Sequence, residues 1–207
     1  MVRVKVKICG ITNLDDALAA VDMGADILGF NFYPQSPRYI EEKLFFDIAP
    51  KLPTYVDIAG VFVNADIVDI RRIVNDGFLN WLQLHGDESI EFCRSLSSLN
   101  VRTIKAIRVR TAMDIMYARR FNTDAVLFDA YNPKLYGGTG EKFNWDLVSS
   151  VDRRVFLAGG IDPENAKEAV DRGTYGIDVC SGVESSPGKK DHAKMKQMFD
   201  NIRDFVK

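Results

Sequence analysis

Residues 2–24 read VRVKVKICGITNLDDALAAVDMG, and the hydrophobic pattern changes in the middle of this stretch. The run VRVKVKI alternates apolar and charged residues, which is typical of a strand. The segment that follows has apolar residues at helical spacing, with Thr12 or Asn13 as a candidate N-cap and Gly24 as a stop. Cys9 lies between the two patterns, at the carboxyl end of the predicted strand. Folds that alternate strands with helices place their chemistry at this end.

The same change of pattern recurs along the chain. Strands are predicted at residues 3–8, 26–32, 56–63, 81–85, 102–108, 124–129, 155–158 and 175–180. Helices are predicted at residues 13–23, 41–51, 66–76, 88–97, 111–120, 144–150, 163–172 and 190–205. Eight such units without a low-complexity linker favour one domain, residues 1–207, folded as a closed (β/α)₈ TIM barrel. An open doubly wound sheet is the alternative, but it typically has fewer strands and a G-x-G-x-x-G loop, which KICGIT is not.

Three helix boundaries carry specific signals. Asp162 followed by Pro163 predicts a cap with proline at the first helical position. Gly77 and Gly173 are predicted to end helices.

The bulk composition excludes several classes of protein. Hydrophobic residues make up 46% and charged residues 27% of the 207 residues, and the net charge is -2, so neither nucleic acid nor an anionic membrane is expected as a partner. The N-terminus alternates charges and does not resemble a signal peptide. Three distant cysteines without a CxxC motif, and only two histidines, argue against a disulfide framework and a metal site. We expect a protein of the reducing cytoplasm.

Polar residues gather where the predicted strands end, while the strand interiors are apolar. They are Cys9, Asn31, Tyr33, Arg38, Asn64, His85, Arg108, Asp129, Gly159, Gly160, Asp178 and Ser181. Because the carboxyl ends of barrel strands converge on one face, this gradient predicts a site there.

Two glycine-bearing turns predict a phosphate site. Gly159-Gly160 follows the seventh predicted strand in LAGGIDPENA, and Ser181-Gly182 follows the eighth in IDVCSGVE. The loops after strands seven and eight form a recurrent phosphate site in barrels, where backbone N–H groups approach the oxygens. Tight turns without a ligand are the alternative. The glycine-rich stretch 136–145, YGGTGEKFNW, is either a cover over a ligand or a surface loop.

The charged candidates each have two interpretations. Asp129, after the apolar run AVLF, is a candidate proton donor or a loop cap. Cys9 is a nucleophile, an acid–base group or a packing residue. Arg38 suits a carboxylate or phosphate, or is a solvated surface group. His85 and Asp178 each have two interpretations as well: they contact a ligand, or they stabilise neighbouring loops. An acid on strand six opposite a thiol on strand one suggests a pair working on a bound sugar.

The motifs together resemble the phosphoribosylanthranilate isomerase family of tryptophan biosynthesis. They are KICGIT, GFNFYPQSPRYI, GVFVN, QLHGDE, LFDAY, GGTGEKFNW, LAGGIDPENA and IDVCSGVESSPGKKD, in this order along the chain. The resemblance implies a (β/α)₈ barrel that converts N-(5-phosphoribosyl)anthranilate to 1-(2-carboxyphenylamino)-1-deoxyribulose 5-phosphate by an Amadori rearrangement. It implies no metal and no organic cofactor, and its partner is a phosphorylated sugar substrate.

The resemblance also implies roles for single residues. Cys9 is expected to be the general base and Asp129 the general acid. Arg38 is expected to bind the anthranilate carboxylate, and the phosphate is expected at Gly160 and Ser181-Gly182. Two positions depart from the usual pattern, since Cys180 stands where a serine is expected and Asn144 where an aspartate is common.

Two rival functions remain open at this stage. The histidine-pathway aldose–ketose isomerase has an aspartate where this chain has Cys9. A sugar-phosphate-binding protein without catalysis would not need both Cys9 and Asp129. The sequence does not specify the oligomeric state.

Overall fold

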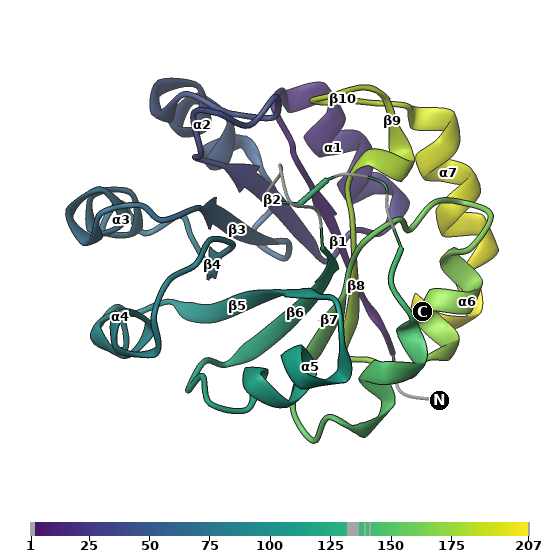
Figure 1. Cartoon of the computed structure of the whole chain (residues 1–207). Helices are drawn as coiled ribbons and strands as arrows, with labels where there is room; N and C mark the ends of the chain where they lie inside the picture. Colours follow the sequence, from purple (N-terminus) through teal and green to yellow (C-terminus); the bar gives the residue numbers. More distant parts are fainter. Residues whose placement is uncertain (1–2, 132–136, 139, 141, 207) are drawn as a thin grey trace.

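Eight parallel strands form the centre of the molecule. The structure, a computed structural model, describes residues 3–131, 137, 138, 140 and 142–206. Each strand pairs with the next in the sequence, and the last pairs with the first, so the sheet closes into a barrel (Figure 1). The strands are β1 (Lys5–Cys9), β2 (Ile27–Asn31), β3 (Asp57–Phe62), β4 (Trp81–Leu84), β5 (Arg102–Val109), β6 (Ala125–Ala130), β7 (Val155–Leu157) and β8 (Gly176–Val179). The predicted TIM barrel is confirmed.

Helical segments surround the barrel and connect its strands (Figure 1). The α-helices are α1 (Leu14–Met23), α2 (Glu42–Ile48), α3 (Ile67–Val74), α4 (Ile90–Ser95), α5 (Ala112–Ala118), α6 (Ala166–Asp171), α7 (His192–Asn201) and α8 (Arg203–Val206). The 3₁₀ helices are η1 (Ala49–Lys51), η2 (Trp145–Ser150) and η3 (Ser181–Val183). Asn13 caps α1 by accepting a hydrogen bond from the Asp16 N–H, and Gly24 ends it with φ at 113°. Both predicted ends of this helix are confirmed.

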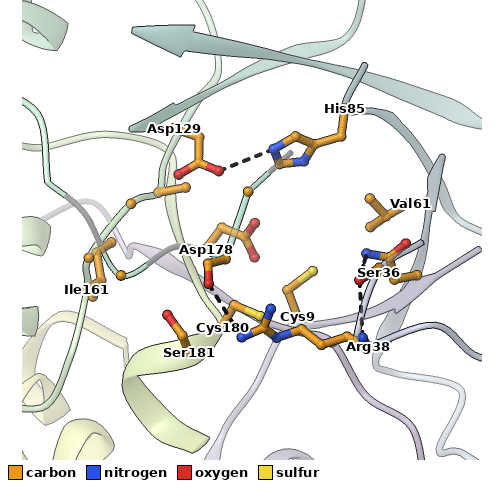
Figure 2. Close-up of a pocket in the computed structure, with 18 residues that line it drawn as sticks. Cys9, Ser36, Arg38, Val61, His85, Asp129, Ile161, Asp178, Cys180 and Ser181 are labelled. Carbon is orange, nitrogen blue, oxygen red and sulfur yellow. Dashed lines mark hydrogen bonds and ion pairs between the residues drawn. The ribbon is translucent and has the colours of Figure 1, made fainter. Parts of the chain in front are cut away.

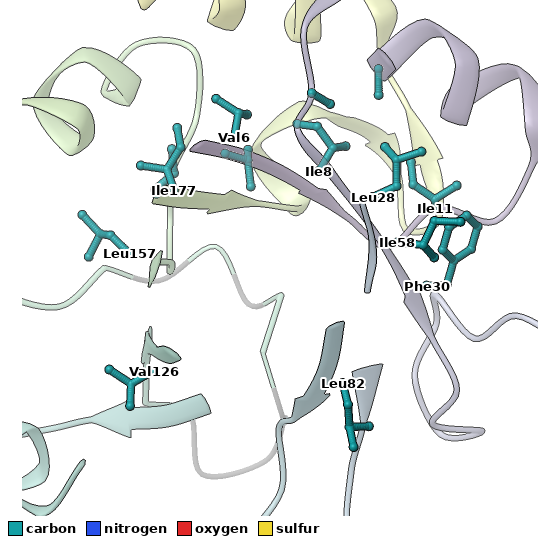
Figure 3. Packing of buried hydrophobic residues seen from close by; sticks show 14 of the residues in the cluster. Val6, Ile8, Ile11, Leu28, Phe30, Ile58, Leu82, Val126, Leu157 and Ile177 are labelled. Carbon is teal, nitrogen blue, oxygen red and sulfur yellow. The ribbon is translucent and has the colours of Figure 1, made fainter. Parts of the chain in front are cut away.

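Alternation along the strands produces two apolar cores. Residues such as Val6, Ile8 and Leu28 point outward and pack with the helices (Figure 3). The opposite strand faces fill the barrel interior with a second cluster: Ile27, Ala59, Trp81, Ile104, Ala106, Ala125, Leu127, Phe156 and Ala158. Because these side chains fill the barrel interior, a ligand has room only at the ends of the barrel.

The region between β6 and β7 differs from its predicted form. The segment predicted as a helix at 144–150 is the 3₁₀ helix η2. Its buried residues Trp145 and Val148 are three positions apart. A 3₁₀ helix has three residues per turn, so both side chains lie on the face toward the core.

The start of α6 was predicted too early. Asp162 and Asn165 exchange hydrogen bonds, each donating its N–H to the Oδ1 of the other at 3.1 and 3.0 Å. This closes residues 163–165 into a turn, and α6 begins only at Ala166. Asp162 still caps this turn, since its Oδ1 accepts from the Asn165 N–H and its carbonyl accepts from the Ala166 N–H at 2.9 Å. The wrong part of the prediction is the helical form of residues 163–165, with Pro163 as the first helical residue.

The segment after β8 contains a hairpin that the sequence pattern does not indicate. Strands β9 (Glu184–Ser186) and β10 (Lys189–Lys190) pair antiparallel. Consequently α7 begins at His192, where Asp191 caps it by accepting from two backbone N–H groups, and not at residue 190 as predicted. The helical segment also breaks at Ile202, before α8.

The two ends of the described chain lie side by side (Figure 1). The Val4 N–H donates to the Phe205 carbonyl at 2.9 Å, which ties the last helix to the first strand. Among the described residues, no helix is long and apolar enough to cross a membrane.

Candidate active site

The carboxyl ends of the strands surround a pocket with about 620 Å³ of empty space, including its open mouth. Figure 2 shows charged and thiol side chains from distant parts of the sequence around it. It is lined by Cys9, Gly10, Asn31, Ser36, Arg38, Val61, His85, Asp129, Gly137, Gly138, Gly140, Ala158, Gly159, Gly160, Ile161, Asp178, Cys180 and Ser181. The structure therefore brings together nine of the twelve residues that the strand ends predict.

Cys9 is buried at the end of β1 and sits above a buried ion pair. Lys7, two residues earlier on the same strand face, donates from Nζ to Asp178 Oδ1 at 2.8 Å, and the two residues are direct partners in the β1–β8 register. A Cβ on Gly29 would lie 2.7 Å from Cys9 Sγ and 2.9 Å from Lys7 Nζ. The missing side chain at Gly29 thus provides the space that the thiol and the ammonium share.

This environment favours the thiolate of Cys9. A hydrogen bond with Cys180 has the largest effect, and the positive charge of Lys7 adds to it. Together they outweigh burial and hold the pKa of Cys9 well below its ordinary value. The contact with Cys9 and burial raise the pKa of Cys180, so Cys9 is the thiolate of the pair. The Cys180 thiol donates to Glu184 Oε1 at 3.9 Å.

Asp178 and Lys7 form a charged pair inside the barrel. Burial raises the pKa of Asp178 to about 6 despite the opposing charge of Lys7, and the negative charge of Cys9 contributes. The pKa of Lys7 is raised above its ordinary value, because Asp178 and Cys9 outweigh the effect of burial. Near neutral pH the pair is charged on both sides.

Asp129 ends β6 in a buried position on the pocket wall (Figure 2). His85 Nε2 lies 3.2 Å from its Oδ2, and the Ala130 N–H donates to its Oδ1 at 2.8 Å. A Cβ on Gly137 would come within 3.0 Å of Oδ2, and one on Gly159 within 3.0 Å of Oδ1. Two glycines therefore leave room for a ligand atom beside the carboxyl group.

Arg38 is buried and held by a carboxylate. Its Nε and Nη2 donate to Glu184 at 3.0 and 2.8 Å, and Nη2 also reaches the Gly138 carbonyl at 3.4 Å. A Cβ on Gly138 would lie 2.6 Å from Nη1, so a glycine is needed where this loop covers the guanidinium. Burial opposes ionisation of Glu184, but hydrogen bonds from Arg38 and the charge of Lys190 keep its pKa below the ordinary value.

The two glycine turns meet at the pocket beside β7 and β8. Gly159 and Gly160 have φ of 85° and 65°, a conformation that favours glycine, and both line the pocket. Ser181 lines it from the start of η3. Gly182 does not line the pocket, but a Cβ there would lie 2.0 Å from the Ile161 carbonyl oxygen. It lets the second turn pack against the first.

Several strand-end residues lie outside the pocket lining. Arg108 pairs with Asp87, and Asn64 is part of the loop after β3, where its φ is 50°. Tyr33 donates its hydroxyl to Gln35. Of the glycine-rich stretch 136–145, the described glycines line the pocket, while residues 136, 139 and 141 lie outside the described residues.

Four residues of this site were not found from the sequence: Lys7, Gln83, Glu184 and Lys190. For Lys7 and Gln83 a signal exists, because each is a polar residue on the face of a strand that points into the barrel. Lys190 donates to the Cys9 carbonyl at 2.6 Å and to Glu184 at 2.9 Å, contacts that connect distant segments and leave no local pattern. In the described part of the chain, no group of three or more His, Cys, Asp or Glu side chains could hold a metal ion.

Comparisons with known proteins show which family this chain resembles. Residues 6–201 match the family model "N-(5'phosphoribosyl)anthranilate (PRA) isomerase". An N-(5'-phosphoribosyl)anthranilate isomerase of Citrifermentans bemidjiense is 45% identical over 198 residues, which is 94% of this chain and 95% of the relative. The phosphoribosyl anthranilate isomerase crystal structure from Thermotoga maritima superposes with a TM-score of 0.88 at 41% identity, covering 97% of this chain and 99% of that one.

A further solved structure shows a relative with a ligand. It is a phosphoribosyl anthranilate isomerase in complex with reduced 1-(o-carboxyphenylamino)-1-deoxyribulose 5-phosphate, at 40% identity and a TM-score of 0.85 over 97% of this chain and 99% of that one. A family model that matches nearly the whole chain, and relatives at this identity over nearly their whole length, establish the family. The chain belongs to the N-(5'-phosphoribosyl)anthranilate isomerases, enzymes of tryptophan biosynthesis.

Proposed function

We propose that this protein converts N-(5-phosphoribosyl)anthranilate to 1-(2-carboxyphenylamino)-1-deoxyribulose 5-phosphate, with Cys9 as general base and Asp129 as general acid. The observation that carries the proposal is that one pocket is lined both by a thiol with a lowered pKa and by a buried carboxyl group. The names of the relatives and the ligand complex support the substrate class.

Asp129 acts first. Its carboxyl group protonates the furanose ring oxygen, the bond from this oxygen to C1 breaks, and the anthranilate nitrogen forms a protonated imine with C1. Gly137 and Gly159 leave both carboxyl oxygens accessible to the sugar. Proton transfer by a positioned group contributes on the order of 10²–10⁴-fold to the rate.

Cys9 acts second. The iminium makes the C2 proton acidic, and the thiolate of Cys9 removes it. The resulting enolamine takes up a proton at C1 and loses the proton of its C2 hydroxyl group, which gives the ketone. An ordinary thiol is only a few per cent ionised at pH 7, so Cys180 and Lys7 raise the fraction of active enzyme by lowering the pKa of Cys9. Cys9 acts as a base, and no covalent intermediate is expected.

The two ends of the substrate bind apart from the reacting atoms. Arg38, fixed by Glu184, offers its guanidinium to the anthranilate carboxylate. The phosphate binds the backbone of Gly159 and Gly160 with the Ser181 hydroxyl, and Gly182 supports this site by letting the two turns pack together. His85 and Asp178, both on the pocket wall, contact the sugar between these ends.

The fluorescence of phosphoribosylanthranilate, followed as the purified protein consumes it, tests this function. Wild-type protein should convert the substrate, and Asp129→Asn should lose at least 100-fold in kcat, because ring opening lacks its acid. Arg38→Ala should mainly raise KM. An exposed substitution, Lys167→Ala, is the control and should leave both constants unchanged. Absence of turnover in the folded wild-type protein would refute the proposal.

A further inference from the structure

Gln83 connects to the proposed acid through His85. It lies on β4, is fully buried, and its Nε2 is 2.8 Å from Nδ1 of His85. The other ring nitrogen, Nε2, lies 3.2 Å from Oδ2 of Asp129 (Figure 2). Oε1 of Gln83 has no hydrogen-bond partner in the described part of the chain. The amide is therefore engaged only through its N–H group, which donates to the imidazole.

This contact decides where the imidazole proton sits. Since Nδ1 accepts from the amide, a neutral ring carries its proton on Nε2, and this N–H donates to Asp129. A proton added to Nδ1 would point at the amide N–H, with two donors facing each other in a buried place. A buried donor without an acceptor costs about 1–3 kcal/mol. Gln83 thus opposes the imidazolium form of His85.

Without such a contact, the opposite protonation would be expected. An ordinary imidazole binds a proton more tightly than an ordinary carboxylate does. Two carboxylates face His85, since Asp129 lies on one side and Asp178, on β8, interacts with it electrostatically. Both favour imidazolium, which would take the proton that a general acid at Asp129 needs.

We propose that Gln83 is a positioning residue that keeps His85 neutral in the Nε2–H form, so that Asp129 and not His85 holds the proton used in ring opening. Because Nε2–H donates to Oδ2 of Asp129, this proton is carried on the other oxygen, Oδ1. The inference rests on the proposed acid role of Asp129 and adds a residue that does not touch the substrate. The buried Gln83 amide supports this inference, because its Nε2 is hydrogen-bonded to His85 while its Oε1 has no partner among the described residues.

Nitrogen-15 NMR of histidine-labelled whole enzyme reads the ring state directly. The chain contains two histidines, His85 and His192, so a His192→Asn variant assigns both pairs of ring signals. In the wild type at pH 7, His85 should show a protonated Nε2 and an unprotonated Nδ1. A proton on Nδ1, with either a neutral or a charged ring, would overturn the inference, and this measurement needs no Gln83 variant.

Two substitutions then test the function of the contact. In Gln83→Glu a carboxylate accepts from Nδ1, so His85 should become imidazolium at pH 7 and kcat should fall at least tenfold with KM changed less than twofold. Gln83→Met removes the donor without adding an acceptor, and should give a mixture of neutral ring forms with a smaller loss in kcat. Wild-type ring signals in Gln83→Glu, or wild-type kcat with a charged ring, would overturn the inference.

Retained turnover in Asp129→Asn would instead refute the proposed acid. The NMR spectra would still report the state of His85, so the two failures are distinguishable.

Discussion

Replacing Lys7 by methionine should raise the pKa of Cys9 by a predictable amount. Cys9 Sγ and Lys7 Nζ both lie within 3 Å of the place where a Cβ on Gly29 would sit, at 2.7 and 2.9 Å. The two atoms are therefore no more than about 5.6 Å apart, and two unit charges at that distance attract each other by about 3 kcal/mol at an effective dielectric constant of about 20. Removing this attraction from the thiolate corresponds to a rise of about 2 pKa units.

Asp178 reduces this effect, because its carboxylate and the Cys9 thiolate repel each other in the wild type and this repulsion is lost when Asp178 becomes neutral. Burial already raises the pKa of Asp178 to about 6 with Lys7 beside it. Without Lys7 the pKa of Asp178 rises further, so the carboxyl group becomes neutral near pH 7 and leaves no buried charge. The double variant Lys7→Met/Asp178→Asn removes the pair in one step and should show a similar rise for Cys9.

Alkylation by iodoacetamide as a function of pH measures the change, since only the thiolate reacts. A lowered pKa means that the thiolate of Cys9 persists as the pH falls, so the wild-type midpoint should lie below the value of about 8.5 for a free cysteine. In Lys7→Met the midpoint should move upward, by at most about 2 pH units. Cys93 reacts little in this range, because burial raises its pKa to about 11. Cys9→Ser supplies the background rate.

A matched control is provided by a second buried lysine. Lys105 pairs with Glu88 at 2.8 Å and is as deeply buried as Lys7, but it lies on β5. Lys105→Met removes a comparable ion pair and should leave the midpoint of Cys9 unchanged. An unshifted midpoint in folded Lys7→Met, or an equal shift in both variants, would refute the electrostatic role of Lys7.

Three further substitutions test other parts of the structure. Glu184→Gln removes the charge that holds Arg38, so KM should rise several-fold with kcat nearly unchanged, and a fall in kcat alone would contradict this. Gly182→Ala places a Cβ 2.0 Å from the Ile161 oxygen, so the two glycine turns of the proposed phosphate site must separate. Inhibition by inorganic phosphate should then weaken at least tenfold, and unchanged inhibition would contradict this phosphate site. Asn13→Ala removes the cap of α1 and should lower the free energy of unfolding by about 1 kcal/mol in urea titration, without changing kcat.

The barrel and most of its pocket were predictable because their signals are local. The change from alternating to helical spacing marks each strand end, and parallel strands in a closed barrel bring these ends together. Cys9, His85, Asp129 and Asp178 could therefore be placed on one face before any contact was known. The surroundings of these residues could not be predicted in the same way. The space that Lys7 shares with Cys9 exists only because the neighbouring strand β2 has a glycine, Gly29, beside both side chains.

Contacts between distant segments explain the remaining differences. Arg38 was predicted to be available for a carboxylate, but Glu184, 146 residues away in the sequence, already binds it. Strand β10 has two residues, which is too short for an alternating pattern, so the hairpin before α7 was missed. Asp162 caps the turn before α6, but a cap signal alone does not show that residues 163–165 form a turn and that α6 begins only at Ala166.

The central claim is that Cys9 removes the C2 proton of the bound sugar. The most direct measurement is turnover of phosphoribosylanthranilate by Cys9→Ala, together with the dissociation constant of reduced 1-(o-carboxyphenylamino)-1-deoxyribulose 5-phosphate. We predict a loss of at least 100-fold in kcat, on the order of what a positioned base contributes, while the ligand binds within about threefold of wild type, a difference of under 1 kcal/mol. Turnover by Cys9→Ala at a rate near that of the wild type would contradict the claim.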